Sequence, residues 1–597
     1  MAEQIVSPGV FQRETDQSFI TPAPVEVGAA IIGPTVRGPV EQPTVVSSFA
    51  DFKQKFGTTF ISASENAEYF TSIAVQKFFA AGGNSMLITR VASGSAFDAT
   101  GSQNTGAWDF ATSTHISSSE KSQTDTRPSF VLKTLGKGTV FNNSTGNLDP
   151  GEHFGDGSLA TGSIDNFRYE ISGINKKVGT FNLTIRRGDD NEINKKVLET
   201  FVGCSLDPTS DNFISKVVGD QFAEHKVLEG QTLIKIRGDH PNKSKFVRVA
   251  SVDLPTTKYL KNDGSIASDS AGVLYSGSLP VTQSGSFHSG VGSNIATTTQ
   301  SLLFENINSS NTQGLVASDY TKAINILKNK DEYRFATLTM PGVYNQDYAS
   351  AVAAAIELCE VRGDAFYIAD MVPYDSTVAT VTAEAGELNT NYAGTYWPWV
   401  KVPSVELSKD VWCPASTVMQ GVYAANDRVA APWFAPAGLN RGGLPIIRTE
   451  FKVTQALRDT LYDNKVNPIA TFPRVGPVAF GQKTLQKAAS ALDRINVRRL
   501  LISLKNFIGD TSKNLVFEQN TTVTRNRFLN AVTPFLESVQ QRQGLFAFRV
   551  VMDESNNTAD AIDRNQLVGQ IFIQPTRTAE FIILDYTIQP TGATFND

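Results

Sequence analysis

Apolar and polar residues recur with different periods along the chain, and these periods predict its elements. Residues 25–40 form an apolar run broken by Gly and Pro, which is typical of a buried strand followed by a turn. In residues 48–57, three phenylalanines recur at helical spacing between Ser48 as the N-cap and Gly57 as the terminator. Residues 66–83 predict a second helix and residues 85–91 a strand. We therefore expect a compact α/β unit at this end.

From residue 333 onward the pattern becomes regular. Residues 333–342 predict a strand, residues 345–363 a helix that ends at Gly363, and residues 364–372 a second strand. This order predicts a parallel pair of strands joined by a right-handed crossover helix. Residues 524–544 predict a late helix.

The stretches between these regions are rich in Ser, Thr, Gly and Asn, notably residues 96–161 and 260–311. Such composition favours turns and short strands over long helices. Strand patterns return at residues 179–190 and 243–254. We expect this part of the chain to be β-rich and to face outward.

The final apolar run, Phe581 to Ile588, predicts a strand with almost no chain after it to pair with. Backbone donors and acceptors in a strand need partners, so this strand has to join an edge elsewhere. Residues 5–19 at the other end also read as extended, and proline-containing segments lie beside both ends. Both ends are expected to leave their own domain as arms.

Composition restricts the function classes. The 597 residues exceed what one hydrophobic core can hold, so several domains are expected. A net charge of -6 and the lack of a basic run argue against general affinity for nucleic acid. No apolar stretch approaches the length of a membrane span, and the N-terminus lacks the pattern of a signal peptide. The chain is therefore expected to be made and kept in a cytoplasm, with its three cysteines buried as small apolar residues.

No motif of an enzyme or a cofactor site emerges. The turn after residue 340 has one glycine where a dinucleotide site needs three, and no P-loop or GxSxG motif occurs. No histidine follows His288, so the α/β half cannot supply a triad from within itself. The acidic run at residues 188–192 lacks the ligand spacing of a calcium loop, so we interpret it as a solvated turn. We expect no catalytic residue, no cofactor and no metal.

A set of basic residues in the last quarter leaves two interpretations open. They could form a charged stripe against an acidic partner, or they could be an ordinary solvated helix face, which is favoured on charge pattern alone. The set includes Arg494, Arg498, Arg499 and Lys505.

An ordered set of segments covers nearly all of the first hundred residues and everything after about residue 333: SPGVFQRETDQS, SFADFKQKFG, QKFFAAGGNSMLITRV, YAGTYWPWVKV, VYAANDRVAAPWFAPAG, INVRRLLISLKNFI, FEQNTTVTRNRFLNAVTPFLESV and IFIQPTRTAEFIILDY. In this order and approximate spacing, the segments resemble the tail sheath proteins of contractile bacteriophages. The segment ETFVGCSLDPTSDNFISKVVGD, at residues 199–220, resembles the outer region of the long, T-even-like sheaths.

The resemblance implies a multidomain fold of α/β and β type. It has an α/β core with a mixed sheet, β-rich outer inserted domains and extended N- and C-terminal arms. Carried onto this chain, it implies an N-terminal arm at 1–20, a middle β-rich domain at 21–95 plus 190–330, an outer insertion at 96–189, an α/β core at 331–510, an inner tube-facing region at 511–580 and a C-terminal arm at 581–597.

The resemblance also implies which residues link subunits. In the N-terminal arm these are Ile5, Val6, Val10 and Phe11, and in the C-terminal arm they are Phe581, Ile582, Ile583, Leu584, Tyr586 and Ile588. The tube-facing candidates are Arg494, Arg498, Arg499, Lys505, Arg525 and Arg527.

The function so implied is a non-enzymatic subunit that polymerises helically around a tail tube and contracts to drive the tube through the host envelope. The expected partners are other copies of the chain, the tail tube protein, and baseplate and tail terminator or neck proteins, with no nucleic acid and no membrane insertion. The expected location is the virion tail, after assembly in the host cytoplasm. A sheath of an R-type pyocin or another contractile injection system is the nearer alternative, and a receptor-binding tail protein or an α/β enzyme is the more distant one.

Overall fold

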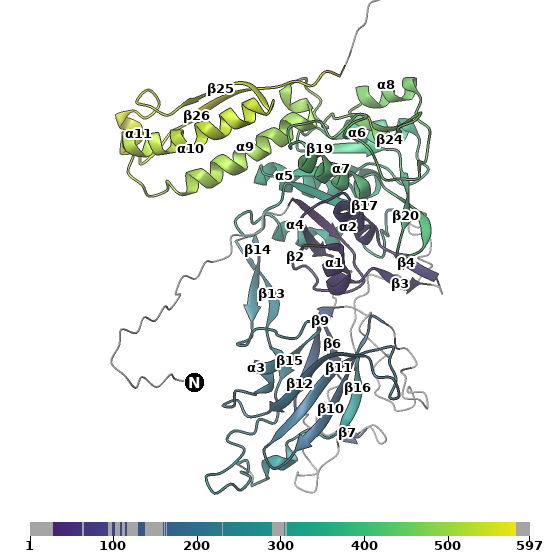
Figure 1. The fold of residues 1–597 in the computed structure, drawn as a ribbon, viewed down its shortest axis with the longest axis vertical. Helices are drawn as coiled ribbons and strands as arrows, with labels where there is room; N and C mark the ends of the chain where they lie inside the picture. Colours follow the sequence, from purple (N-terminus) through teal and green to yellow (C-terminus); the bar gives the residue numbers. More distant parts are fainter. Residues whose placement is uncertain are drawn as a thin grey trace, which may run out of the picture.

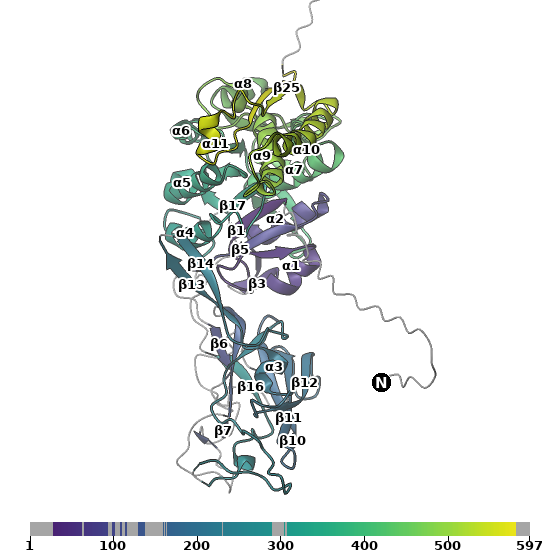
Figure 2. The same ribbon diagram turned by 90° about the vertical axis from the view of Figure 1, so that its left-hand side faces the viewer.

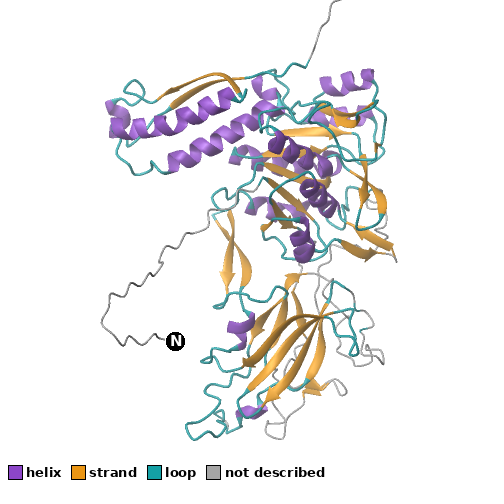
Figure 3. Ribbon diagram, viewed as in Figure 1, coloured by secondary structure: helices purple, strands orange, loops and turns teal. Residues whose placement is uncertain are grey.

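The computed structural model describes residues 28–580 apart from 63–64, 93–97, 102–107, 110–113, 116–128, 138–158, 160–161, 163, 230, 271, 289–303 and 305–306. Three regions follow one another along the long axis of the molecule (Figure 1). A β domain lies at the lower end, an α/β core in the middle, and a helical C-terminal lobe at the upper left. Colouring by secondary structure separates the strand-rich lower end from the helical lobe (Figure 3).

The α/β core is built on an eight-stranded sheet with the order β2-β5-β1-β17-β18-β19-β23-β24. The six inner strands run parallel, and β2 and β24 pair antiparallel at the two edges. Parallel sheets need cover on both faces. Helices α4 and α5 pack together on one face and α2 and α7 on the other (Figure 2). The strands are β1 (Ala29–Gly33), β2 (Thr44–Val46), β5 (Met86–Arg90), β17 (Thr337–Tyr344), β18 (Phe366–Asp370), β19 (Ala393–Trp397), β23 (Val466–Phe472) and β24 (Gly476–Ala479).

The helices of this region are α1 (Phe49–Phe56), α2 (Phe70–Ala80), α4 (Ala317–Ile326), α5 (Asn345–Arg362), α6 (Val378–Glu387), α7 (Ser416–Val429) and α8 (Gln455–Asp463). Short strands border it: β3 (Thr59–Ser62), β4 (Glu65–Glu68), β20 (Val400–Ser404), β21 (Lys409–Cys413) and β22 (Arg448–Thr449).

The predicted strand–helix–strand unit is confirmed. Strands β17 and β18 are parallel neighbours, and α5 connects them. Gly363 ends the helix with a φ of 72°, and its N–H donates to the carbonyl of Cys359 at 2.9 Å. Left-handed backbone of this kind favours glycine, so the position of the stop follows from residue type. The three cysteines are free and buried, as expected.

The predicted domain division differs from the observed strand pairing in its first part. It grouped residues 21–95 with the middle β-rich domain, whereas β1 and β5 lie inside the core sheet and β1 pairs with β17. The side chains of β1 and β5 are all buried, as expected for inner strands of a parallel sheet that is covered on both faces. The chain thus supplies its core sheet from two segments about 300 residues apart in sequence.

The β domain is an antiparallel seven-stranded sheet with the order β12-β11-β10-β16-β6-β9-β15. Its core contains Phe130, Tyr169, Phe181 and Ile185. The predicted boundary at residue 189 runs through this sheet, because β11 pairs with β12 across it. Its elements are β6 (Asp98–Gly101), β9 (Val131–Lys137), β10 (Phe167–Asn175), β11 (Thr180–Arg187), β12 (Val197–Ser205), α3 (Ile214–Val218), β15 (Val247–Ser251) and β16 (Gln283–His288), with the separate pairs β7 (Trp108–Asp109) and β8 (Thr114–His115), and β13 (Phe222–Leu228) and β14 (Gln231–Arg237).

The C-terminal lobe consists of two long helices, α9 (Ile495–Lys513) and α10 (Thr522–Gln541), a short helix α11 (Ala559–Asp563), and a ribbon of β25 (Leu545–Val551) and β26 (Gln570–Pro575). Helix α9 contributes to two cores. Its residues Ile495 and Ile502 belong to the core of the α/β region, while Leu500 and Leu504 belong to that of the lobe. The lobe is therefore attached to the α/β core by a helix that both cores bury.

Candidate assembly surfaces

The β25–β26 ribbon is a two-stranded sheet with one covered face. Phe548 pairs with Ile573 and Val550 with Ile571, and all four side chains pack against the lobe core. The opposite face exposes Phe572, which is 56% accessible. An isolated two-stranded ribbon is marginally stable, and this one relies on α10 beneath it.

Each strand of the ribbon has one edge that pairs with no other strand among the residues described. Such an edge presents a row of backbone donors and acceptors that another strand can join. Phe546 lies at a bulge in β25, where its carbonyl accepts from Gln540 of α10 at 2.9 Å and its side chain is 75% exposed. The ribbon thus offers two open edges on a preformed support.

A second apolar feature lies at the turn between α9 and α10. Phe517 is fully exposed and has a φ of 71°, and Val516 beside it and Val523 in the first turn of α10 are also exposed. The left-handed region is unfavourable for a bulky residue. The turn therefore holds an aromatic side chain in water at some conformational cost.

The residues predicted to link subunits lie outside the described part of the chain. This holds for Ile5, Val6, Val10 and Phe11 of the N-terminal arm and for Phe581, Ile582, Ile583, Leu584, Tyr586 and Ile588 of the C-terminal arm. Their role remains a prediction.

The six basic residues do not share one exposed face. Arg498 and Arg499 are each 4% exposed. The Arg498 guanidinium lies 3.9 Å from the ring centre of Tyr392 and donates to Asn391 Oδ1. Burial lowers the pKa of Arg498, while the neighbouring Tyr392 raises it.

Arg499 joins α9 to α7. Its guanidinium forms an ion pair with Asp427 and lies 4.6 Å from the ring centre of Tyr423. Arg525 is likewise buried and donates to Asn520 Oδ1 at 2.8 Å. The interpretation of an exposed basic stripe is thus wrong for Arg498 and Arg499, because each guanidinium is enclosed by the subunit itself. Arg525, a separate tube-facing candidate, is enclosed in the same way.

The other three residues lie at separate places. Lys505 is exposed and donates weakly to Tyr392 Oη at 3.4 Å, and Arg527 is exposed beside Glu518 at 3.5 Å. Arg494, at the N-cap of α9, forms a bidentate ion pair with Glu580. Of these six residues, Lys505 and Arg527 present an exposed side chain to a partner, and their contact with a tube stays a prediction.

The acidic run at residues 188–192 is an internal ion-pair network rather than a solvated turn. The Asp190 carboxylate is buried and accepts from Arg168 at 2.8 Å and from Arg186 at 2.6 Å. Arg186 also pairs with Glu192 at 3.0 Å. The acidity noted in the sequence is therefore matched by buried arginines from β10 and β11. Within the described ranges, no group of three or more His, Cys, Asp or Glu is arranged to hold a metal ion.

The comparisons with known proteins agree with the resemblance. Residues 487–589 match the family model of the phage tail sheath C-terminal domain. The chain is 40% identical over 185 residues to the tail sheath protein of Vibrio phage KVP40 and 39% identical over 187 residues to that of Enterobacteria phage T4. The resemblance to tail sheath proteins is confirmed.

These matches cover part of each protein. Each alignment spans 31% of this chain and 28% of the relative. The crystal structure of a sheath tail protein from Listeria innocua aligns with 89% of this chain and 89% of its own, with a TM-score of 0.51 at 9% identity. That likeness concerns the fold, and it confirms the predicted mixed α/β multidomain class.

The region matched by the sheath family model contains most of the C-terminal features described above. It includes α9, α10, the ribbon and Glu580, and it begins at Lys487, close to Arg494. Among the described residues, no helix is long and apolar enough to cross a membrane.

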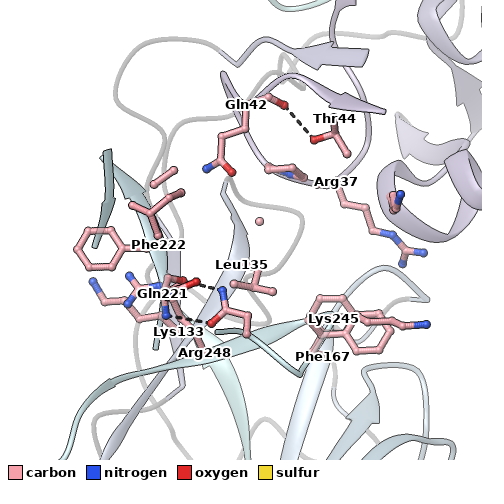
Figure 4. A pocket seen from close by; sticks show the side chains of 18 of the residues that line it. Arg37, Gln42, Thr44, Lys133, Leu135, Phe167, Gln221, Phe222, Lys245 and Arg248 are labelled. Atoms are coloured by element: carbon pink, nitrogen blue, oxygen red, sulfur yellow. Dashed lines mark hydrogen bonds between the residues drawn. The ribbon is translucent and has the colours of Figure 1, made fainter. Parts of the chain in front are cut away.

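A cleft of about 1060 Å³ separates the α/β core from the β domain. Arg37 and Thr44 line it from the core, and Lys133, Phe167 and Arg248 from the β domain (Figure 4). Its walls thus come from two regions with separate hydrophobic cores.

Direct polar contacts join the two regions around this cleft. Arg37 and Asp165 approach to 3.7 Å. On the β13–β14 hairpin, His225 Nε2 lies 2.9 Å from the carbonyl of Glu41. Among the described residues, the α/β core and the β domain belong to separate hydrophobic clusters, and these polar contacts lie between them.

Proposed function

We propose that the chain is a structural subunit of a contractile phage tail sheath, which polymerises helically around the tail tube and contracts to drive the tube through the host envelope for genome delivery. The observation that carries the proposal is the position of the family match, which falls on the lobe that bears the open ribbon. The tail sheath proteins of phages KVP40 and T4 support it by sequence identity. The role is mechanical, and no catalytic step is assigned to it.

Strand addition supplies the link between subunits. The N- and C-terminal arms join the two open edges of the β25–β26 ribbon on other copies. A strand that makes six backbone hydrogen bonds contributes about 3–9 kcal/mol, at ~0.5–1.5 kcal/mol net for each bond. The two surfaces of such a contact differ, so a pair of subunits still has one free surface of each kind. Further subunits can therefore add, and the assembly grows as a ring or a helix.

Contraction is a rigid-body rearrangement of the subunits within this mesh, from a long metastable state to a short stable one. The shared burial of α9 supports movement of the lobe and the α/β core as one body. The arms keep the subunits joined while these bodies change their relative orientation. The cleft between the α/β core and the β domain leaves room for the β domain to change its orientation separately.

The partners follow from this role. They are other copies of the chain, the tail tube protein, and baseplate and tail terminator or neck proteins. The net charge of -6 does not favour nucleic acid as a partner. The site of action is the virion tail, and assembly takes place in the host cytoplasm.

Electron microscopy of the purified chain in negative stain tests the proposal. We expect tubes of uniform diameter at high protein concentration, and dispersed folded monomers from two variants that lack residues 1–20 or 581–597. Circular dichroism of the variants serves as the control for folding. Full-length protein that stays monomeric, or truncated variants that assemble as well as the full chain, would contradict the proposal.

A further inference from the structure

The last residue that the structure describes, Glu580, is held by three side chains that lie far from it in sequence. Arg494 at the N-cap of α9 donates to its two carboxylate oxygens at 2.7 and 2.9 Å. Gln482 Nε2 donates to Oε1 at 3.0 Å, and Tyr462 Oη in α8 donates to Oε2 at 3.0 Å. Bidentate pairing of this type fixes both the position and the orientation of a carboxylate.

The same group of side chains also holds the residue two positions earlier. Gln482 Nε2 donates to Thr578 Oγ1 at 2.5 Å. The preceding strand β26 ends at Pro575, and Thr576 donates its N–H to the carbonyl of Gly544 at 3.3 Å. The chain therefore passes from the lobe to the α/β core between Thr576 and Glu580. At the end of this passage, hydrogen bonds from Gln482 and Arg494 hold Thr578 and Glu580 in place.

The environment favours a charged Glu580. Its side chain is 16% exposed and that of Arg494 25%. Burial raises the pKa of this carboxyl, but the hydrogen bonds from Arg494 and Gln482 outweigh burial and leave the pKa below its usual range. The Tyr462 ring lies beneath the Lys483 ammonium, 4.0 Å from its centre, so the tyrosine that contacts Glu580 is itself fixed.

We propose that Arg494, Gln482 and Tyr462 form a clamp on Glu580 that fixes where the C-terminal arm leaves the subunit, so that capture of the arm by another copy depends on this ion pair. The inference rests on the proposed function, because it concerns the arm that begins at residue 581. An arm that starts from a fixed point has a higher effective concentration at its binding edge than one whose base moves freely. The clamp also passes tension from the arm into α9, which both cores bury.

Three variants test the clamp: Arg494→Met, Glu580→Gln, and the charge exchange that combines Arg494→Glu with Glu580→Arg. The first measurement is hydrogen exchange in the monomer. We expect faster exchange at residues 577–580 in the two single variants and no change in β25 and β26. The second measurement is the critical concentration for tube formation, by sedimentation. We expect a rise of about three- to tenfold in the single variants and partial recovery in the charge exchange.

Arg334→Met is the matched control. It removes another bidentate pair, Arg334 with Asp510 at 2.7 and 2.6 Å, which lies away from Glu580 in sequence and is more exposed. If Arg494→Met changes exchange and assembly no more than Arg334→Met does, the clamp is refuted. Faster exchange with an unchanged critical concentration also refutes it, since the arm would then be captured without the clamp.

The variant that lacks residues 581–597 separates the two proposals. If this truncated chain assembles normally, the C-terminal arm is not a link and the proposed function fails with the clamp. If it fails to assemble while Arg494→Met assembles normally, the clamp alone is wrong.

Discussion

Replacement of Arg499 by methionine should destabilise the subunit, because this residue ties α9 to α7 from a buried position. Its side chain is 4% exposed, whereas that of its partner Asp427 is 34% exposed. Loss of one member costs about 3–5 kcal/mol for a fully buried pair and at most ~1 kcal/mol for an exposed one. A half-buried pair falls between these values, at about 1–3 kcal/mol.

The contact with Tyr423 adds to this loss. The guanidinium lies 4.6 Å from the ring centre, and a cation over an aromatic ring contributes ~0.5–2 kcal/mol. The methionine side chain keeps part of the apolar packing. The net expectation is a decrease of about 2–4 kcal/mol in the free energy of unfolding.

Urea denaturation followed by tryptophan fluorescence measures this difference. The matched control is Arg527→Met, which removes an exposed ion pair at 3.5 Å and should cost less than ~0.5 kcal/mol. If the two variants lose the same small amount, the account of Arg499 as a buried anchor is wrong. A stable Arg499→Met variant with a defect in tube contact would instead restore the interpretation of a tube-facing stripe.

Three further predictions concern other parts of the chain. Burial raises the pKa of Asp370 to about 7 against the opposing hydrogen bonds from Ser416, so the folded state binds more protons than the unfolded state between about pH 4 and 7. The stability from this group is therefore greatest below about pH 4 and is lost as the pH rises to 7. The melting temperature of Asp370→Asn should depend less on pH over this range than that of the unchanged chain, and an equal dependence would refute the raised pKa of Asp370. Phe517→Asn should leave the monomer as stable or up to ~1 kcal/mol more stable, because Asn tolerates the left-handed backbone better, and clear destabilisation in urea would show that the exposed ring packs in the monomer. Lys505→Glu and Arg527→Glu should keep the fold and weaken co-sedimentation with purified tail tubes in a salt-dependent way, whereas unchanged binding would exclude both from the tube contact.

Local patterns were enough to predict several elements. Helix α1 is capped by Ser48, whose side chain accepts from Asp51 N–H, and by Gly57, which has a φ of 68°, as its sequence indicates. The unit of β17, α5 and β18 could be predicted because its periodicity and the glycine at its stop agree. Each of these features depends on residues within a few turns of one another.

Features set by distant contacts could not be predicted in this way. The pairing of β1 with β17 joins Ala29 to Thr337, and no local pattern at either residue encodes its partner. The positions of charged residues in the sequence wrongly suggested that Arg498 and Arg499 are exposed. A helical pattern shows which side chains are charged, but it does not show that a tyrosine or a neighbouring helix encloses them. Arg494 and Glu580 are 86 positions apart, so their pairing had no signal in the spacing of residues.

Helical reconstruction of the assembled tubes by electron cryo-microscopy would show directly whether strands cross between subunits. We expect both open edges of the β25–β26 ribbon on every subunit to be hydrogen-bonded to strands whose density continues into other copies. Tails that fold back onto the ribbon of their own subunit, with no strand crossing between copies, would contradict this expectation.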